Sequence, residues 1–242
     1  MIVIVLGMHK SGTTLISNVL HHSGINMVED YQHGISYDDG NKAERYFTKK
    51  INNELLGSSS LFSLMIRPLS NSVSKESKIK MKNLVNEINT THLNWGFKDP
   101  RTCFTYDDWS DVAPSHKVLV VFRSPKEVWV HYWNNARSIR KKVLTIRYFF
   151  HSWCLHNQYI LNYLSETKND YLVLDYSRFM NDDTDFQKLE EFLGISLVDE
   201  RRKELHRSIS AGSFGFNLSK FVHKLKGGDN PDKILKKLQA YL

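Results

Sequence analysis

The sequence lacks the features that mark disulfide-rich, zinc-binding, membrane-spanning and secreted proteins. Its only cysteines, Cys103 and Cys154, are too few and too far apart for a disulfide framework or a zinc site. No apolar stretch is long enough to span a membrane, and residues 1–6 lack the basic start of a secretory signal peptide. These absences predict a protein of a reducing compartment, with a cytoplasmic location and no transmembrane segment.

Length and charge indicate the number of domains and the kind of partner. The chain has 242 residues, of which 41% are apolar, enough for one sizeable core, so we expect a single domain over residues 1–242. The formal net charge of +7 is spread along the chain and favours anionic partners without singling out nucleic acid. The basic run at residues 137–142 keeps a nucleic-acid-binding protein open as an alternative, although the aromatic residues nearby fit a helical core better than a base-stacking platform.

Predicted strands and helices alternate along the chain. Apolar runs predict buried strands at residues 2–6, 95–98, 117–122 and 171–174. Apolar spacing and capping residues predict helices at 13–22, at 75–90 with Ile79 on the inner face, after Pro125, around 146–164, at 183–193 and near 234–238. This alternation predicts an α/β fold of three layers, with a mostly parallel central sheet flanked by helices and ligands at the carboxyl ends of its strands. The polar residues 25–50 are predicted to form a surface excursion that holds substrate, before a helix that carries Ile51, Leu55 and Leu56.

The first predicted strand is followed by a glycine-rich loop, GMHKSGTT, at residues 7–14. Gly7 and Gly12 have the G-x-x-x-x-G spacing of a phosphate-binding P-loop, so we expect a P-loop-type fold. Nucleoside triphosphatases place a lysine after the second glycine, but Thr13 occupies that position here and the lysine of the loop is Lys10. Such a loop binds anions through its backbone N–H groups and the helix that follows. A cation at Lys10 suits a sulfuryl group on a phosphate, where it stabilises the charge left on the bridging oxygen.

Several segments resemble the sulfotransferases that use 3′-phosphoadenosine 5′-phosphosulfate (PAPS). GMHKSGTT looks like their 5′-phosphosulfate loop, and FRSPKEVWVHYW at 122–133 resembles their 3′-phosphate-binding segment. WGFKDPRTCF at 95–104 is similar to the Lys-Asp-Pro segment of the bacterial glycan-type and tyrosylprotein branches, and EFLGISL at 191–197 resembles a helix end of the family. The resemblance follows the chain in order over roughly residues 1–200. It implies PAPS as co-substrate, 3′,5′-adenosine bisphosphate as product and no metal.

The resemblance also implies the residues that bind the donor. Those for its 5′ end come from the loop: His9, Lys10, Ser11, Gly12, Thr13 and Thr14. Arg123 and His131 bind the 3′-phosphate, and Tyr176 holds the adenine. A serine is usual in the family where this chain has His131, which makes donor binding sensitive to pH. The alternative for Arg123 is an ordinary surface ion pair with Glu127.

Catalysis in this family consists of in-line attack by an acceptor hydroxyl on sulfur. The catalytic candidates are Lys10, Lys98, Asp99 and Glu44. Lys98 resembles the lysine that steadies the transition state, and its alternative is a local salt bridge with Asp99 before a turn. Asp99 and Glu44 are the candidate bases, because Thr48 stands where the bacterial pattern ends in glutamate. Glu29 follows the first helix at about the distance where the tyrosylprotein enzymes carry their base.

These observations predict a sulfotransferase that acts on a hydroxyl of a carbohydrate or glycolipid, with a small-molecule or glycan acceptor and no nucleic-acid partner. One alternative is a P-loop small-molecule kinase with Asp175 as its magnesium-binding acid. The others are a non-catalytic nucleotide- or nucleic-acid-binding protein and a family member that binds PAPS but has lost its base. The basic C-terminal residues, such as Arg201 and Lys220, either close over the donor or form a solvated face.

Overall fold

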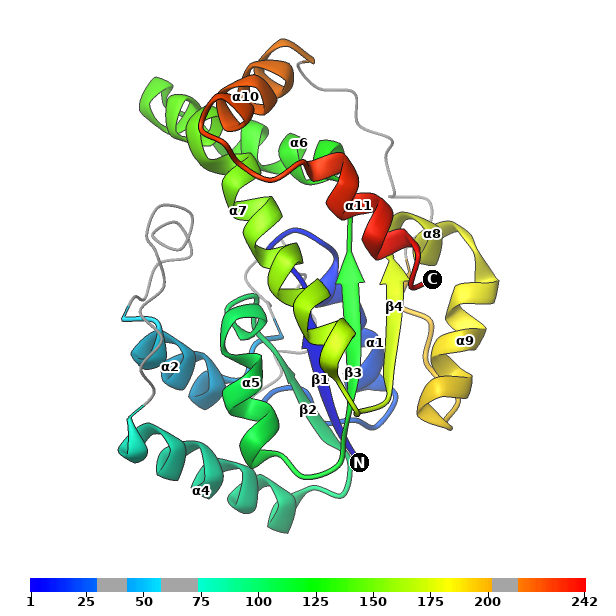
Figure 1. Ribbon diagram of the computed structural model, residues 1–242. Helices are drawn as coiled ribbons and strands as arrows, with labels where there is room; N and C mark the ends of the chain where they lie inside the picture. Colours follow the sequence, from blue (N-terminus) through cyan, green and yellow to red (C-terminus); the bar gives the residue numbers. More distant parts are fainter. Residues whose placement is uncertain (30–42, 58–73, 202–212) are drawn as a thin grey trace.

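Four parallel strands form the central sheet of the protein (Figure 1). The computed structural model describes residues 1–29, 43–57, 74–201 and 213–242. The strands are β1 (Ile2–Leu6), β2 (Trp95–Lys98), β3 (His116–Phe122) and β4 (Tyr171–Asp175), in the order β2-β1-β3-β4. The predicted parallel sheet is confirmed, and only the start of β3 and the end of β4 differ from the predicted bounds, each by one residue.

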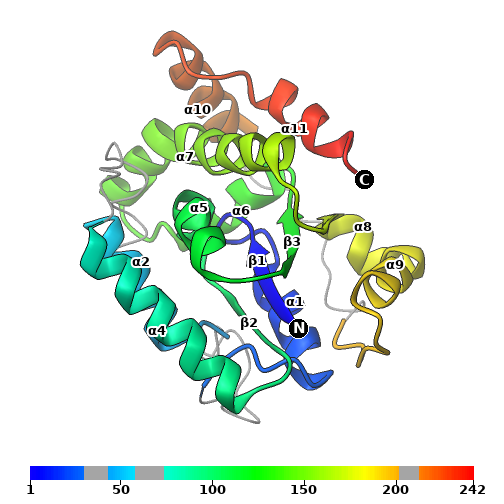
Figure 2. The same ribbon diagram turned by 60° about the horizontal axis from the view of Figure 1, so that its bottom comes forward.

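Helices cover both faces of the sheet and give the predicted three layers (Figures 1 and 2). One face packs against α4 (Lys75–Thr91), α5 (Thr102–Val112), α6 (Pro125–Asn135), α7 (Ile139–Glu166), α10 (Ser213–Leu225) and α11 (Pro231–Gln239). The other face packs against α1 (Thr13–His22), α8 (Tyr176–Asn181) and α9 (Asp183–Leu193). The remaining helix, α2 (Tyr46–Leu55), lies against α4 and α5.

Strand β1 shows why the sequence folds into these layers. All five of its residues are buried, and successive side chains of a strand point to opposite faces. Ile2, Ile4 and Leu6 therefore join the core beneath α5 and α7, whereas Val3 and Val5 join the core beneath α1. A strand covered by helices on both sides needs apolar residues at every position, which the run IVIVL supplies.

Capping residues set the helix boundaries as predicted. The side chain of Ser124 accepts a hydrogen bond from the backbone N–H of Glu127, and Pro125 is the first residue of α6. Gly194 ends α9 with a φ of 73°, a left-handed conformation that glycine adopts without strain. In the part of the chain that the structure describes, no helix combines the length and apolar character needed to cross a bilayer.

Three details differ from the sequence predictions or extend them. Ile79 is 60% exposed, so its predicted place on the inner face of α4 is wrong, and Met81 is buried there instead. The helix predicted around Ile51 and Leu55 is confirmed as α2, but it begins at Tyr46, within the segment predicted as an irregular excursion. Residues 30–42 of that excursion lie outside the described residues.

The C-terminal part contributes packing and ion pairs. Ile234 and Leu238 of α11 are buried against the core that includes α7, as the apolar spacing predicts. Arg201 bonds to the carboxylates of Asp183 and Asp199, each at 2.7 Å. Lys220 pairs with Asp232 across the turn from α10 to α11. Arg201 and Lys220, which are predicted either to close over the donor or to form a solvated face, thus pair with carboxylates of the same chain.

Candidate active site

Four segments of candidate site residues each follow a strand and meet at one edge of the sheet: residues 7–14, 98–101, 123–125 and 175–176. In a parallel sheet all carboxyl ends lie on the same side, and the register pairs Val5 of β1 with Lys98 of β2 and Leu6 with Val120 of β3 (Figure 1). The glycine loop after β1 therefore lies between Lys98 and Arg123. Tyr176 follows β4 at the same edge.

The glycine loop has the backbone of an anion-binding turn. Lys10 and Gly12 adopt positive φ values of 72° and 96°, and the Ser11 N–H donates to the Met8 carbonyl at 3.0 Å. Helix α1 begins directly after Gly12, so the positive end of its dipole faces the loop. At Gly7 a Cβ would lie 2.4 Å from the Val121 carbonyl oxygen, so a side chain there would collide with β3.

Arg123 reaches the glycine loop through the ring of Tyr176. Its guanidinium carbon lies 4.6 Å from the centre of the Tyr176 ring, and Nη1 lies 3.0 Å from His131 Nε2. The same tyrosine ring covers Gly12, where a Cβ would lie only 1.9 Å from Cδ2 of Tyr176. Arg123 is 8% exposed. The structure thus brings together the two motifs that sequence reasoning assigned to opposite ends of one nucleotide.

Glu127 forms an ion pair with Arg123. Its Oε1 lies 3.5 Å from Arg123 Nε, so the ion pair predicted as the alternative for Arg123 is present. The hydroxyls of Ser124 and Ser177 donate to the Glu127 carboxylate at 2.6 and 2.5 Å. Burial by itself raises the pKa of Glu127, but these hydrogen bonds and Arg123 outweigh it and lower the pKa below its ordinary value. Arg123 is therefore fixed in place by Glu127, Tyr176 and His131.

A buried ion pair lies on the other side of the loop. Lys98 Nζ lies 3.1 Å from Glu44 Oε1 and donates to Thr14 Oγ1 at 3.3 Å. The side chains of Lys98 and Glu44 are only 2% and 9% exposed. Burial by itself raises the pKa of Glu44, but Lys98, Lys49 and Arg101 outweigh it, so the pKa lies below its ordinary value of 4.5. An ionised carboxylate and an ammonium group therefore stand side by side next to the glycine loop.

The segment that carries Glu44 is tied to the fold by its neighbours. The Ser17 hydroxyl of α1 donates to the Ala43 carbonyl at 3.2 Å. Arg45 is 2% exposed and donates to the Gly96 carbonyl of β2 at 3.3 Å and to the Asn26 carbonyl at 2.8 Å. Sequence reasoning did not identify Arg45, because no motif or apolar pattern distinguishes a buried arginine from one on the surface. These bonds hold Glu44 against β2 and its Lys98.

The second candidate base, Asp99, lies in the interior. It is fully buried and accepts hydrogen bonds from the backbone N–H of Arg101 at 3.0 Å and from the Arg101 side chain at 2.9 Å. Its other oxygen accepts from Asn52 Nδ2 at 3.1 Å. Both members of the predicted Lys98–Asp99 bridge thus have other partners, Glu44 and Arg101. Asp99 is thus held by contacts inside the fold, whereas the candidate base Glu44 lies beside the loop.

The other acids and the threonine considered in the sequence also have structural contacts. Glu29 Oε2 accepts from the Tyr46 N–H at 2.9 Å, at the first turn of α2. Thr48 is fully buried in α2 and donates to the Arg45 carbonyl at 2.9 Å. Asp175 accepts from the backbone N–H of Ser177 at 2.8 Å as the N-cap of α8, and burial raises its pKa. A magnesium-binding acid at Asp175, as a kinase requires, is not favoured by this capping role.

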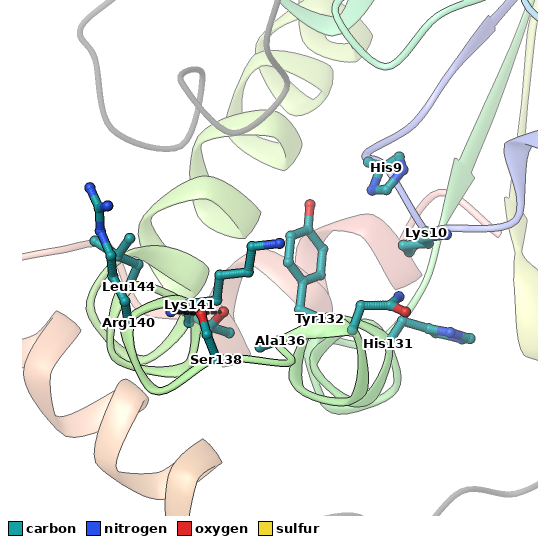
Figure 3. A pocket seen from close by; sticks show the side chains of 11 residues that line it. His9, Lys10, His131, Tyr132, Ala136, Ser138, Arg140, Lys141 and Leu144 are labelled. Atoms are coloured by element: carbon teal, nitrogen blue, oxygen red, sulfur yellow. Dashed lines mark hydrogen bonds between the residues drawn. The ribbon is translucent and has the colours of Figure 1, made fainter.

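A cavity of about 540 Å³ opens beside the loop (Figure 3). His9 and Lys10 of the loop line it on one side, and the end of α6 and the start of α7 line it on the other. The ring of Tyr132 contacts the His9 ring edge-on, with 6.0 Å between the ring centres. The loop therefore lies next to both the buried Arg123 and a cavity large enough for a small molecule.

Comparison with known proteins agrees with the fold and identifies the family. The sequence profile of the sulfotransferase domain family matches residues 2–220. No curated protein sequence gives a significant match. Among solved structures, sulfotransferase STF9 from Mycobacterium avium is similar with a TM-score of 0.60 and 11% identity, over 99% of this chain and 75% of that chain.

Two further structures show the same fold. The sulfotransferase domain of the Synechococcus PCC 7002 olefin synthase has a TM-score of 0.54 and 14% identity, over 95% of both chains. The sulfotransferase domain from the curacin biosynthetic pathway has a TM-score of 0.50 and 14% identity, over 98% of this chain and 96% of that one. At such identities the likeness concerns the fold, whereas the profile covers most of the sequence. The chain therefore belongs to the sulfotransferase domain family, whose sulfuryl donor is PAPS.

Proposed function

We propose that this PAPS-dependent sulfotransferase transfers the sulfuryl group to a hydroxyl of a carbohydrate or glycolipid, with Glu44 as the general base. The observation that carries the proposal is the Lys98–Glu44 pair, 3.1 Å apart and joined to the glycine loop through Thr14. It places a cation and an ionised carboxylate beside the loop that would hold the phosphosulfate. The carbohydrate acceptor rests on the resemblance of residues 95–104 to the glycan-type branch.

The donor is proposed to lie across the carboxyl ends of β1, β3 and β4. Its 5′-phosphosulfate binds the backbone N–H groups and hydroxyls of the loop, supplied by His9, Lys10, Ser11, Gly12, Thr13 and Thr14. Its 3′-phosphate binds Arg123 and His131, and its adenine lies near Tyr176. Charge-assisted bonds from a guanidinium to a phosphate are strong, and Arg123 is already oriented by Tyr176 and Glu127. Tyr176 contacts both regions, so one nucleotide can span them.

The transfer step needs one base and cations around the sulfur. The acceptor oxygen attacks sulfur, the bond from sulfur to the bridging oxygen breaks, and the 5′-phosphate of the bisphosphate product leaves with the electron pair. Glu44 takes the hydroxyl proton, and Lys10 stabilises the negative charge that develops on the bridging oxygen. Lys98 neutralises the sulfuryl oxygens and keeps Glu44 ionised at neutral pH. Asp99, buried and bonded to Arg101 and Asn52, supports the turn after β2.

Calorimetry with 3′,5′-adenosine bisphosphate tests the donor site. The bisphosphate is expected to bind without magnesium and more tightly than ADP or ATP, because only it has a 3′-phosphate for Arg123. Arg123→Ala should lower its affinity by about 1.5–3 kcal/mol for each charged hydrogen bond lost, and should change the affinity for 5′-AMP far less. Lys10→Ala should abolish transfer and retain most bisphosphate binding, since Lys10 acts on the bridging oxygen.

Other outcomes would contradict the proposal in distinct ways. Binding of ATP that depends on magnesium and exceeds that of the bisphosphate would favour the kinase. Binding of oligonucleotides without either nucleotide would favour the nucleic-acid alternative. Tight bisphosphate binding without transfer to any tested sugar or lipid hydroxyl would indicate a family member that has lost its base.

A further inference from the structure

The cavity beside the glycine loop has a basic far end. From His9 and Lys10 it extends along α6 to the first turn of α7, where Arg140 and Lys141 line it. In Figure 3 the Lys141 side chain reaches toward Tyr132, whereas the Arg140 side chain points away from it, and both side chains are exposed. The cavity thus connects the loop that holds the reacting group with two cations on a different element.

The donor does not account for these cations. In the proposed function its two phosphate-bearing ends are taken by the loop and by Arg123, on the side of β3 and β4. His131, which contacts Arg123, also lines the cavity, but it points away from Lys141 in Figure 3, and the cavity continues from Lys10 toward α7. The part of the cavity near α7 is therefore left for the acceptor.

The lining near α7 is suited to a negative charge. Among the described residues that line the cavity, none is an aspartate or a glutamate. Within the described ranges, no carboxylate forms an ion pair with Arg140 or Lys141, whereas the neighbouring Lys142 lies over the Trp133 ring at 5.2 Å. Leu144 and Tyr132 provide apolar walls beside the two cations. A cavity with apolar walls and a few polar groups is typical of small-molecule sites.

We propose that this cavity binds an acceptor that carries its own negative charge, a carboxylate or an existing sulfate ester, held by Arg140 and Lys141. The proposal rests on the proposed function and narrows its acceptor to an acidic sugar or an acidic glycolipid headgroup. It also assigns a role to part of the basic run at residues 137–142, which otherwise favoured nucleic acid. Arg140 offers a guanidinium fork that fits carboxylate and sulfate, and Lys141 adds a mobile point charge.

The test compares two probes that differ only by one carboxylate group. 4-Nitrophenyl β-D-glucuronide and 4-nitrophenyl β-D-xyloside share their ring hydroxyls and aglycone, and the first adds a carboxylate. Their affinities are measured by calorimetry and ligand-observed NMR on protein saturated with 3′,5′-adenosine bisphosphate, which fills the phosphate sites. The glucuronide is expected to bind about tenfold more tightly than the xyloside.

Matched variants show where the preference arises. The double variant Arg140→Ala, Lys141→Ala should remove the preference and leave xyloside and bisphosphate affinity unchanged. Lys236→Ala, Lys237→Ala removes the same charge from exposed positions of α11 and should retain the preference. Equal affinities for the two probes, including undetectable binding of both, or a preference that survives the first double variant, would overturn the proposal.

Failure of this inference is distinguishable from failure of the proposed function. The bisphosphate titration that precedes the probes reports on the donor site alone. Bisphosphate binding without a glucuronide preference refutes the anionic acceptor and leaves the donor assignment intact. Absence of bisphosphate binding refutes the donor assignment, and with it the proposed function on which the acceptor inference rests.

Discussion

The glycine loop and the buried Lys98–Glu44 pair next to it are built in different ways. They are called here the loop side and the packed side of the site. On the loop side, the end of β1, two residues with positive φ and the start of α1 form the candidate anion site from ten consecutive positions, residues 5–14. On the side of Lys98 and Glu44, two side chains 54 positions apart in the sequence meet in the interior. The loop side depends on backbone conformation, whereas the packed side depends on contacts between side chains that are distant in the sequence.

This difference predicts how each side tolerates change. A backbone site depends on dihedral angles and close contacts, so most of its side chains can vary while its glycines cannot. A buried pair depends on both partners, because removing one leaves an uncompensated charge in the interior. Variants of the two sides should therefore fail differently, in donor affinity for the loop and in stability and rate for the pair.

Lys98→Met should have the largest effect on stability. It removes the cation beside Glu44, so we expect a loss of about 3–5 kcal/mol in the free energy of unfolding, as for other broken buried pairs. The transfer rate should fall by about 10²–10³, because a preorganised cation is lost from the transition state. Lys49→Met is the control, since Lys49 pairs with the same carboxylate at 3.7 Å but is 42% exposed.

Urea denaturation and single-turnover transfer measure both quantities. The control should change stability by no more than about 1 kcal/mol, the range of an exposed ion pair, and leave the rate within a few-fold. Similar behaviour of the two lysine variants would show that burial of Lys98 does not decide its importance. The proposed difference between the packed Lys98–Glu44 pair and the backbone-built glycine loop would then not hold.

Glu44→Gln and Asp99→Asn separate the two candidate bases. Glu44→Gln should lower the transfer rate by about 10²–10⁴, the contribution of a positioned base. Asp99→Asn should chiefly lower stability, because Asp99 is fully buried and its loss of charge removes the ion pair with Arg101. The rate per folded molecule should change little in that variant. A reversed pattern, with the rate lost only in Asp99→Asn, would make Asp99 the base.

The stabilisation that Glu44 contributes should decrease as the pH is lowered. Because the pKa of Glu44 in the folded protein lies below its ordinary value of 4.5, its charge stabilises the fold above that value, and this contribution is lost as the pH falls through the folded pKa. The difference in unfolding free energy between the native protein and Glu44→Gln should thus shrink from pH 7 toward pH 4. Urea denaturation at both values measures it, and a difference that grows on acidification would contradict the pairing with Lys98.

The loop side was predictable because its determinants are local. Helix α1 spans Thr13–His22, as its apolar spacing predicts, and α6 begins at Pro125 after the predicted cap Ser124. A run of apolar residues identifies a strand of a parallel sheet, and parallel strands bring their carboxyl ends to one edge. The meeting of Arg123 with the loop follows from these local signals and the order of the strands.

The packed side was predictable only in part, because it depends on contacts between distant segments. Lys98 and Asp99 are adjacent, but successive side chains at a strand end point to opposite sides, so Lys98 faces Glu44 whereas Asp99 faces Asn52. No sequence pattern shows which of the two faces the loop. Arg45 and Asn52 are buried and bonded to several segments, yet each resembles a surface residue when it is considered alone.

Gly12→Ala should have the smallest of these effects and gives the sharpest test of the loop side, because the chain offers a matched control. Gly24 has a φ of 91° against 96° for Gly12, but a Cβ at Gly24 would have no neighbour within 4 Å. Both variants should lose about 1–2 kcal/mol of stability from the left-handed backbone. Only Gly12→Ala displaces Tyr176, and through it Arg123, so it alone should weaken bisphosphate binding, by about tenfold. If calorimetry gave the two variants equal affinity, Tyr176 would not couple the loop to Arg123, and the two phosphate regions would act independently.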